Sequence, residues 1–313
     1  MPSPIENRVL LGDCRTVLQS LPEESVACCI TDPPYNYEFI GRNWDHAEIS
    51  RRIDRIQDSS TLVKNIPYGS GLAGGVRNKR WYERNKDNIV EYQNWCAQWG
   101  SAVFRVCKAG AIVAVFSSTR TFAHVQVALE EAGFYARDCL VYRRHSGIPK
   151  GLNLKKKLKK IGRSDADEWD GWHTCFRSEW EAIAILQKPL VNNYIETTAI
   201  TGLGPFKTIN KDGSFQSNIL EGFSRSAEES FDAHCTIKPL ALVRRLIDLF
   251  VPRSPRNIVL DPFAGSGTTL VAAAELGYPY LGIEIEEEYL KLIRERLAAV
   301  ETGSLFPLFT HGA

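Results

Sequence analysis

The sequence lacks the features of a membrane protein, a secreted protein or a disordered chain. No run among its 313 residues reaches the roughly 18 apolar positions that a membrane-spanning helix needs. The first residues, MPSPIENRVLLGD, have no basic start followed by an apolar core, so no signal peptide is expected. No low-complexity tract or internal repeat is present. We therefore expect a cytoplasmic chain with no membrane partner.

Signals for metal and disulfide chemistry are also missing. None of the eight cysteines forms a C-x-x-C pair, and most lie in apolar segments where Cys behaves as a small hydrophobe. We expect no disulfide scaffold and no metal site. The formal net charge is only +1, so the total charge indicates no partner. Its distribution is uneven, because nine Lys or Arg and no acid lie between Arg143 and Arg163.

The pattern that is present alternates between strands and helices in a composition ordinary for a globular chain, 44% hydrophobic and 24% charged. Strand-like apolar runs occur at 8–11, 26–30, 111–116, 134–142, 181–186, 257–260 and 279–283. Helical patterns occupy 89–106, 119–132, 239–251, 268–276 and 286–300. The alternation predicts an α/β sheet covered by helices on both faces, with ligands at the carboxyl ends of the strands.

Three long polar segments interrupt this alternation and predict substrate-facing insertions in a single domain spanning 1–313. Residues 37–88 contain Gly69, Gly71, Gly74 and Gly75 beside a basic and aromatic cluster, which is either a loop closing over a substrate or an ordinary surface loop. Residues 143–178 begin with the basic run. Residues 188–233 are rich in Thr, Ser, Gly and Asn.

The first motif with chemical content is Thr31-Asp32-Pro33-Pro34-Tyr35-Asn36, directly after an apolar strand. The two prolines cannot continue a central strand and fix an extended turn. Such a turn would present the Asp32 carboxylate, the Pro33 carbonyl and the Tyr35 ring at the sheet edge. Two acceptors and an aromatic face suit a planar base bearing an amino group. The alternative is a plain β-turn, since Asp-Pro is common in turns.

The second motif, Asp261-Pro-Phe-Ala-Gly-Ser-Gly-Thr-Thr269, lies between a strand and a helix, the usual place for a nucleotide-like cofactor. It is no Walker A loop, because Thr and not Lys follows Gly267. Glu284 follows 17 residues after Gly267, at the end of the next strand, where a carboxylate can accept both ribose hydroxyls. Alternatively, Glu284 is a first-turn acid that stabilises the last helix.

Together, Asp-Pro-Pro-Tyr and Phe-x-Gly-x-Gly resemble the S-adenosylmethionine-dependent DNA amino-methyltransferases. The catalytic motif precedes the cofactor loop by about 230 positions, which resembles the β class and argues against the Asn-Pro-Pro-Tyr methylases of protein glutamine. Residues 11–14, Leu-Gly-Asp-Cys, resemble the segment that holds the cofactor adenine. Residues 234–239 resemble the segment near the methionine moiety, with Cys235 where Pro is usual.

The resemblance implies a Rossmann-like class I methyltransferase fold with a mixed seven-stranded sheet, in which 134–142 and 181–186 form the antiparallel edge. It implies catalysis by Asp32, Pro33, Pro34 and Tyr35. The implied residues for S-adenosylmethionine are Asp13, Cys14, Asp32, Thr236, Lys238, Asp261, Phe263, Ala264, Gly265, Ser266, Gly267, Thr268 and Glu284.

The implied function is site-specific methylation of the exocyclic amino group of a flipped base in double-stranded DNA. Adenine N6 is favoured, because Asp as the first motif residue is commoner among adenine enzymes than Ser. Cytosine N4 is the alternative, followed by an RNA methyltransferase or a non-catalytic DNA binder. The 5-methylcytosine enzymes use a Pro-Cys nucleophile, which this sequence lacks.

The basic clusters predict contacts with the DNA backbone. The residues concerned are Arg77, Lys79, Arg80, Arg143, Arg144, Lys150, Lys155, Lys156 and Lys157. The alternative for the lysine run is a solvated helix face. Residues 188–233 occupy the place of the family's target-recognition region. A cognate restriction endonuclease and a homodimer are further partners that the resemblance leaves open, in a prokaryotic or phage-type setting.

Overall fold

The structure of the protein is a computed structural model that describes residues 5–35, 79–144, 151–225 and 237–302, with only the backbone for 79–85. The chain divides into two compact units. Unit 1 contains residues 1–35, 93–144 and 180–313, and unit 2 contains 36–92 and 145–179. Unit 2 therefore corresponds closely to the first two predicted insertions, whereas 188–233 belongs to unit 1.

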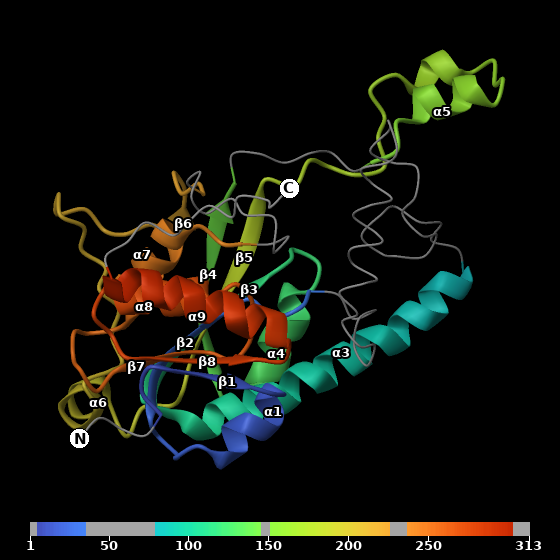
Figure 1. Cartoon of the computed structure of the whole chain (residues 1–313). Helices are drawn as coiled ribbons and strands as arrows, with labels where there is room; N and C mark the ends of the chain where they lie inside the picture. The colour runs from blue at the N-terminus through green and yellow to red at the C-terminus, as the bar shows by residue number, and fades with distance from the viewer. Residues whose placement is uncertain (1–4, 36–78, 145–150, 226–236, 303–313) are drawn as a thin grey trace, which may run out of the picture. The chain divides into compact units, whose positions relative to one another are not determined.

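Unit 1 is built on one eight-stranded sheet in the order β1-β8-β7-β2-β3-β5-β4-β6 (Figure 1). The strands are β1 (Arg8–Leu11), β2 (Val26–Thr31), β3 (Cys107–Ser117), β4 (Tyr135–Arg143), β5 (Trp180–Gln187), β6 (Ile219–Leu220), β7 (Ile258–Asp261) and β8 (Tyr280–Glu284). The α/β prediction is confirmed. The strand count is eight and not seven, because the two-residue β6 carries too few residues to show a strand pattern in the sequence.

The predicted antiparallel edge was wrong in detail. Only β5 runs against the other strands, since it pairs antiparallel with both β3 and β4, while β4 pairs parallel with β6. The short β6 therefore forms the edge, outside β4. Because β5 alone is reversed, its first residues lie at the same end of the sheet as the last residues of β2 and β3.

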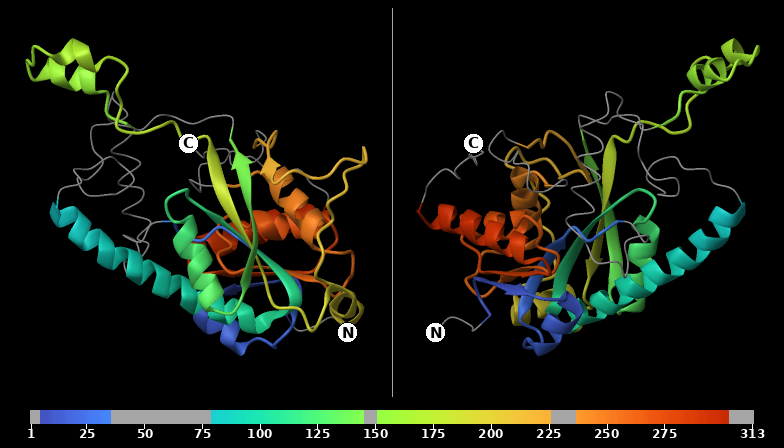
Figure 2. Two further views of the ribbon diagram at one scale, coloured as in Figure 1. Left: turned by 180° about the vertical axis from the view of Figure 1, so that it is seen from behind. Right: turned by 45° about the vertical axis from the view of Figure 1, so that its right-hand side comes forward.

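Helices cover both faces of the sheet in unit 1 (Figure 2). The carboxyl-terminal part of α3 (Lys79–Val106) and α4 (Phe122–Glu131) lie on one face. On the other lie α7 (Leu240–Phe250), α8 (Thr268–Glu275) and α9 (Glu287–Thr302). Every residue of β2, β7 and β8 is buried, as expected for parallel strands covered on both sides. α3 begins ten residues before the predicted start, because its first residues form helix well without an apolar stripe.

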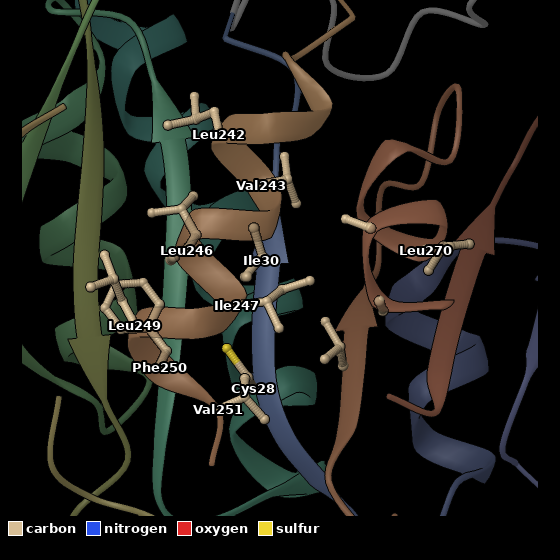
Figure 3. Packing of buried hydrophobic residues seen from close by; sticks show 14 of the residues in the cluster. Cys28, Ile30, Leu242, Val243, Leu246, Ile247, Leu249, Phe250, Val251 and Leu270 are labelled. Atoms are coloured by element: carbon tan, nitrogen blue, oxygen red, sulfur yellow. The ribbon is translucent and has the colours of Figure 1, made fainter. Parts of the chain in front are cut away.

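α7 fixes the position of Lys238, which lies two residues before it. Its apolar residues pack on Cys28 and Ile30 of β2 and on Leu270 of α8 (Figure 3). Leu242, Leu246 and Ile247 are fully buried. At roughly 1.5–3 kcal/mol per buried side chain, this contact holds the helix firmly on the sheet. Lys238, two residues before α7, is thereby held at the carboxyl end of β2.

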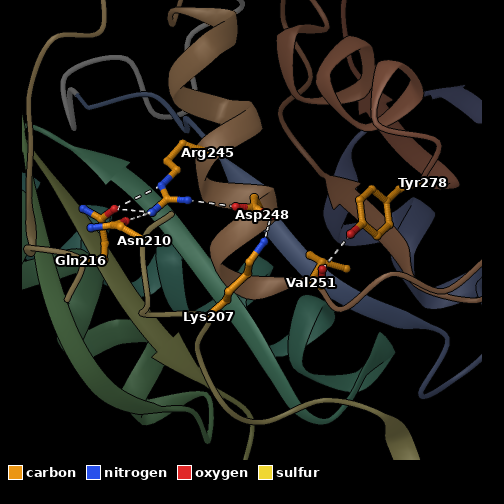
Figure 4. Close-up of polar contacts among 7 residues, drawn as sticks. All are labelled: Lys207, Asn210, Gln216, Arg245, Asp248, Val251 and Tyr278. Carbon is orange, nitrogen blue, oxygen red and sulfur yellow. Dashed lines mark hydrogen bonds and ion pairs between the residues drawn. The ribbon is translucent and has the colours of Figure 1, made fainter. Parts of the chain in front are cut away.

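Residues 188–216 are anchored away from that end. Thr201, in α6 (Tyr194–Thr201), donates to the carbonyl of Ala109 near the start of the apolar part of β3. Farther along, Arg245 of α7 bonds to Asn210 and Gln216 (Figure 4). The same helix carries Asp248, which accepts from Lys207. In the described part of 188–233, β6 pairs with Val141 and Tyr142 at the end of β4 that lies beside the site.

Unit 2 contains α5 (Leu154–Lys160) and the 3₁₀ turn η3 (Ala166–Trp169). Lys155 bonds to Asp167 and Asp170, and Lys159 bonds to Asp167 at 2.8 Å. The remaining short elements of the described chain are α1 (Cys14–Val17) and η1 (Leu18–Ser20) in unit 1. In the described ranges, no helix has the length and apolar character to cross a membrane, and no group of three potential ligand residues is arranged for a metal ion.

Candidate active site

A pocket opens in unit 1 at the carboxyl ends of β2 and β7. Its volume is about 470 Å³, counting the open mouth. The lining residues are Thr31, Asp32, Phe116, Lys238, Val243, Asp261, Phe263, Ala264, Gly265, Ser266, Thr268 and Thr269. Eight of the thirteen predicted cofactor residues are therefore brought together here. Thr31, Phe116, Val243 and Thr269 line the pocket without having been predicted from the sequence.

Asp32 follows directly on β2 and projects from the sheet edge into this pocket. Its Oδ2 accepts a hydrogen bond from Lys238 Nζ. Its Oδ1 is buried and has no hydrogen-bond partner among the described residues. The ring of Tyr35 packs on the same core as β2, and its centroid lies 5.3 Å from Lys238 Nζ. The Asp-Pro-Pro-Tyr turn thus combines a carboxylate that has an acceptor atom to spare with a nearby aromatic ring.

Asp261, at the end of β7, is a buried acid that ties the two motifs together. Its Oδ1 accepts from the Thr31 hydroxyl at 2.7 Å and from the Phe263 amide at 3.1 Å. Burial raises the pKa of Asp261 to about 7, against the hydrogen bonds from Thr31 and Thr269 that act to lower it. Because Thr31 precedes Asp32, this bond sets the direction in which the Asp-Pro-Pro-Tyr turn leaves the sheet.

The glycine loop turns sharply between β7 and α8. Gly267 has φ +80°, and a Cβ at this position would lie 2.9 Å from the Ile293 side chain. Any residue other than glycine would therefore strain the backbone and collide with α9. Arg296 of α9 donates to the carbonyl of Ser266, which fixes the loop from below. The loop is rigid where it faces the pocket.

Glu284, at the end of β8, is buried behind the loop. Its Oε2 accepts from the Gly265 amide at 2.7 Å, and its Oε1 accepts from the Ile285 and Glu286 amides at 2.8 and 3.0 Å. Burial raises the pKa of this carboxyl, and the three amide bonds oppose the rise. Glu284 belongs to β8 and is therefore not a first-turn acid of α9, which begins at Glu287. It contacts the glycine loop directly.

The structure adds Glu181, a charged residue that the sequence interpretation did not select. Glu181, the first charged residue of β5, lies at the pocket end because that strand is reversed. Its Oε1 is 2.8 Å from Arg144 Nη1, and its Oε2 is 3.5 Å from Lys238 Nζ. A single acid at the head of an apolar strand was the available signal in the sequence. The direction of β5, which makes that acid significant, was not.

Asp13 and Cys14 follow β1, beside the end of β8. Asp13 caps α1. Its carboxylate accepts from the main-chain amide and the guanidinium of Arg15, the second residue of that helix. The side-chain bond to Arg15 lowers the pKa of Asp13, whereas burial raises that of Cys14 to about 12. Arg15 also donates to Gln98 of α3 at 2.8 Å. Arg15, absent from the predicted set, thus covers the Asp13 carboxylate.

Phe263 forms an aromatic wall with α3. Its ring centroid lies 5.5 Å from that of Trp95 and 5.4 Å from that of Trp99. These distances are typical of favourable aromatic pairs. Phe263 also lines the pocket, so its ring offers a surface on which a planar ring could stack.

The predicted DNA contacts fall into several groups. Arg77, Lys150 and the predicted cofactor residue Thr236 lie outside the described residues, and the side chains of Lys79 and Arg80 are not described. Arg143 and Arg144 pair with Glu221 and Glu181. In unit 2, Lys155 is paired with two acids, whereas Lys156 and Lys157 are exposed and form no ion pair within the described chain.

The sequence of this chain is similar to those of known DNA methyltransferases. The DNA methylase model of the N6/N4 methyltransferases matches residues 26–295. The Type II methyltransferase M.HindIII of Haemophilus influenzae is 31% identical over 306 residues, covering 92% of this chain and 94% of its own length. M.HinfI of the same species is 24% identical and is covered over 69% of its length.

Solved structures share the fold. The Thermus thermophilus protein TTHA0409, in complex with S-adenosyl-L-methionine, has a TM-score of 0.55 at 22% identity, with 98% of this chain and 99% of that one covered. The cytosine-N4-specific PvuII DNA methyltransferase has a TM-score of 0.55 at 16% identity, covering 95% and 93%.

The order of the two motifs, their meeting in one pocket and the family match over residues 26–295 lead to one conclusion. The chain belongs to the N6/N4 DNA methylase family, the S-adenosylmethionine-dependent DNA methyltransferases that act on adenine N6 or cytosine N4.

Proposed function

We propose that the protein methylates N6 of adenine in double-stranded DNA at a specific sequence. The observation that carries the proposal is the Asp32 carboxylate, whose Oδ1 is buried in the pocket and accepts no hydrogen bond from the described residues. A buried acceptor without a donor is costly, and a ligand amino group can satisfy it. Adenine N6 and cytosine N4 are such groups. The choice of adenine rests on Asp as the first residue of the motif.

The chemistry required of Asp32 follows from the weakness of an exocyclic amino group as a nucleophile. Its lone pair is delocalised into the ring of the base. Hydrogen bonds from the amino group to Asp32 and to the Pro33 carbonyl favour a pyramidal nitrogen with an available lone pair. S-adenosylmethionine supplies an electrophilic methyl group on its sulfonium. The residues then contribute orientation and electrostatic stabilisation, and no covalent enzyme intermediate is required.

The described residues fit S-adenosylmethionine. Gly265 of the glycine loop lines the pocket and has no Cβ, so the backbone can approach a ligand closely there. Glu284 has about four lone-pair sites and uses three of them for amides, so one site, on Oε2, remains to accept from a ribose hydroxyl. The aromatic wall around Phe263 offers a stacking surface for adenine.

The DNA side of the proposal rests on shape and charge. A base inside a duplex cannot reach Asp32, so it must be flipped, and Tyr35 would stack on it. The exposed Lys156 and Lys157 of unit 2 would contact phosphates, as would Arg143. Within 188–233, we assign base reading to the part from β6 onward, because the preceding residues are anchored at other places on the fold.

Nucleoside mass spectrometry tests the proposed base. DNA of varied sequence is incubated with the protein and S-adenosylmethionine, digested and analysed. N6-methyladenine is the expected product. Detection of N4-methylcytosine would mean that the same site acts on cytosine and not on adenine. Methylation of RNA in a parallel reaction would mean that the substrate is RNA and not DNA. The absence of any methylated nucleoside would leave the non-catalytic DNA binder.

We also propose partners and a location. M.HindIII and M.HinfI are Type II methyltransferases, which supports a cognate restriction endonuclease as a partner. Protection of methylated DNA from cleavage by candidate endonucleases tests this. A homodimer remains the family expectation, and light scattering of the purified protein measures it. A DNA substrate supports the prokaryotic cytoplasm as the location, with association with the nucleoid during activity.

A further inference from the structure

Lys238 neutralises the carboxylate on which the proposed reaction depends, although Oδ1 of Asp32 stays without a donor among the described residues. Its Nζ donates to Asp32 Oδ2, so a cation already occupies one face of the acceptor. The side chains are only 10% and 23% exposed, which makes the pair largely shielded from water. A carboxylate neutralised in this way is a weaker acceptor for a base amino group.

The position of the Lys238 charge also opposes the transfer itself. Methylation places positive charge on the amino nitrogen in the transition state. An ammonium held on the same carboxylate would repel that charge in a poorly hydrated pocket. Lys238 must therefore move away from Asp32 as the base binds. Removal to water is unfavourable, because Phe116 and Tyr35 rings flank Nζ at 5.0 and 5.3 Å.

A second carboxylate is available beside it. Glu181 Oε2 is 3.5 Å from Lys238 Nζ and accepts no hydrogen bond from the described residues. Its other oxygen is held by Arg144 at 2.8 Å, and its side chain is only 14% exposed. Arg144 thus fixes the carboxylate in place, while Oε2 still faces the lysine.

We propose that Glu181 is a positioning residue that accepts the Lys238 ammonium when the amino group of the target base binds Asp32. A shift of Nζ from Asp32 Oδ2 to Glu181 Oε2 requires only a rotation of the flexible lysine side chain. Each oxygen of Glu181 then has one cation, and both oxygens of Asp32 are available to the base. The charge that would oppose the transfer is neutralised at a distance from the amino nitrogen. The inference rests on the methyl transfer proposed above.

Glu181→Gln tests this in the full-length protein. The amide keeps the size of the side chain but removes the charge that attracts Lys238. We expect kcat on unmethylated plasmid DNA to fall by at least about tenfold, while the dissociation constant of S-adenosylmethionine, measured by calorimetry, stays within about twofold. The control is Glu275→Gln, which removes an acid bonded to Arg244 between α7 and α8. It should leave both constants unchanged.

Glu181→Asp provides a second measurement that does not depend on the stability of the first variant. It retains the charge but withdraws the carboxylate from Lys238, so kcat should be intermediate. Wild-type kcat in either variant would overturn the proposal. So would a parallel loss of S-adenosylmethionine affinity, because the residue would then act on the cofactor. If wild-type protein itself transfers no methyl group to DNA, the proposed function fails instead, and the two failures are distinguished.

Discussion

The Glu284 carboxylate holds the Gly265 amide at 2.7 Å and so connects the end of β8 to the glycine loop. Its other oxygen accepts from two amides directly before α9. Three backbone donors therefore depend on one buried side chain. The residue predicted to contact the cofactor also keeps the cofactor loop in shape.

Replacement of Glu284 by Ala should weaken cofactor binding and the fold together. The loss of a ribose acceptor should raise the dissociation constant of S-adenosylmethionine at least about tenfold, since bonds to a charged group contribute about 1.5–3 kcal/mol. The loss of the amide acceptors should lower the free energy of unfolding by about 1–3 kcal/mol. Calorimetric titration and urea unfolding measure the two effects.

Glu287→Gln is the matched control, because Glu287 is an exposed acid in the first turn of α9. Its replacement should leave cofactor affinity unchanged. An unchanged dissociation constant in Glu284→Ala would exclude the ribose role and leave only the structural one.

Asp32→Ala should abolish methyl transfer while cofactor binding persists. Without the carboxylate, only the Pro33 carbonyl would accept from the amino group, and a loss of about 10²–10⁴-fold is expected for a group acting in the transition state. Scintillation counting of tritiated methyl groups on DNA measures the transfer, and calorimetry measures the cofactor. Retained turnover would remove Asp32 from the mechanism. Asp138→Ala, at an exposed acid of β4, is the control.

The parts of the site that follow local rules were predictable from the sequence. Asp32 and Glu284 each lie at the end of an apolar strand, and Gly267 precedes a helix, so their places followed from the order of elements. Parallel strands bring such positions to one edge. The meeting of Asp32 and Asp261 in one pocket follows from that rule.

Contacts that depend on strand direction or on long-range packing were not predictable. Glu181 reaches Lys238 only because β5 runs against its neighbours, and no local pattern reports direction. Nor could the ion pair between Arg144 and Glu181 be predicted, because Arg144 is one of many basic residues in its segment. Similarly, the composition of 188–233 could not predict the hydrogen bond from Thr201 to the Ala109 carbonyl, which anchors α6 beside β3. Each of these contacts joins residues far apart in the chain.

Asp261 should make the stability of the protein fall as pH rises. Its pKa is about 7 in the folded protein, against the ordinary value of 3.8. Between these values the folded state keeps a proton that the unfolded state releases, so the stabilising contribution is complete below pH 3.8 and is lost as pH rises through about 7. Asp261→Asn stays uncharged and should lose this dependence.

Urea unfolding of wild type and Asp261→Asn from pH 5 to 8 measures that difference. The variant should gain stability relative to wild type as pH rises, and the gain should level off above the pKa of Asp261. Asp138→Asn, which changes an exposed acid, should show no such trend. A constant difference between Asp261→Asn and wild type across this range would mean that Asp261 is ionised in the folded protein.

Replacement of Lys156 and Lys157 by alanine should weaken DNA binding and make it less dependent on salt. Lys156 and Lys157 are exposed and form no ion pair within the described chain, so their charges are available to phosphates. Each phosphate contact contributes a slope of about 0.9 to the dependence of log affinity on log salt, so the double alanine variant should flatten it by about two. Arg163→Ala is the control, because Asp165 already neutralises Arg163 at 2.6 Å. Fluorescence anisotropy of a labelled duplex in rising potassium chloride measures the slopes. An equal slope in the double variant and wild type would show that this helix face is merely solvated.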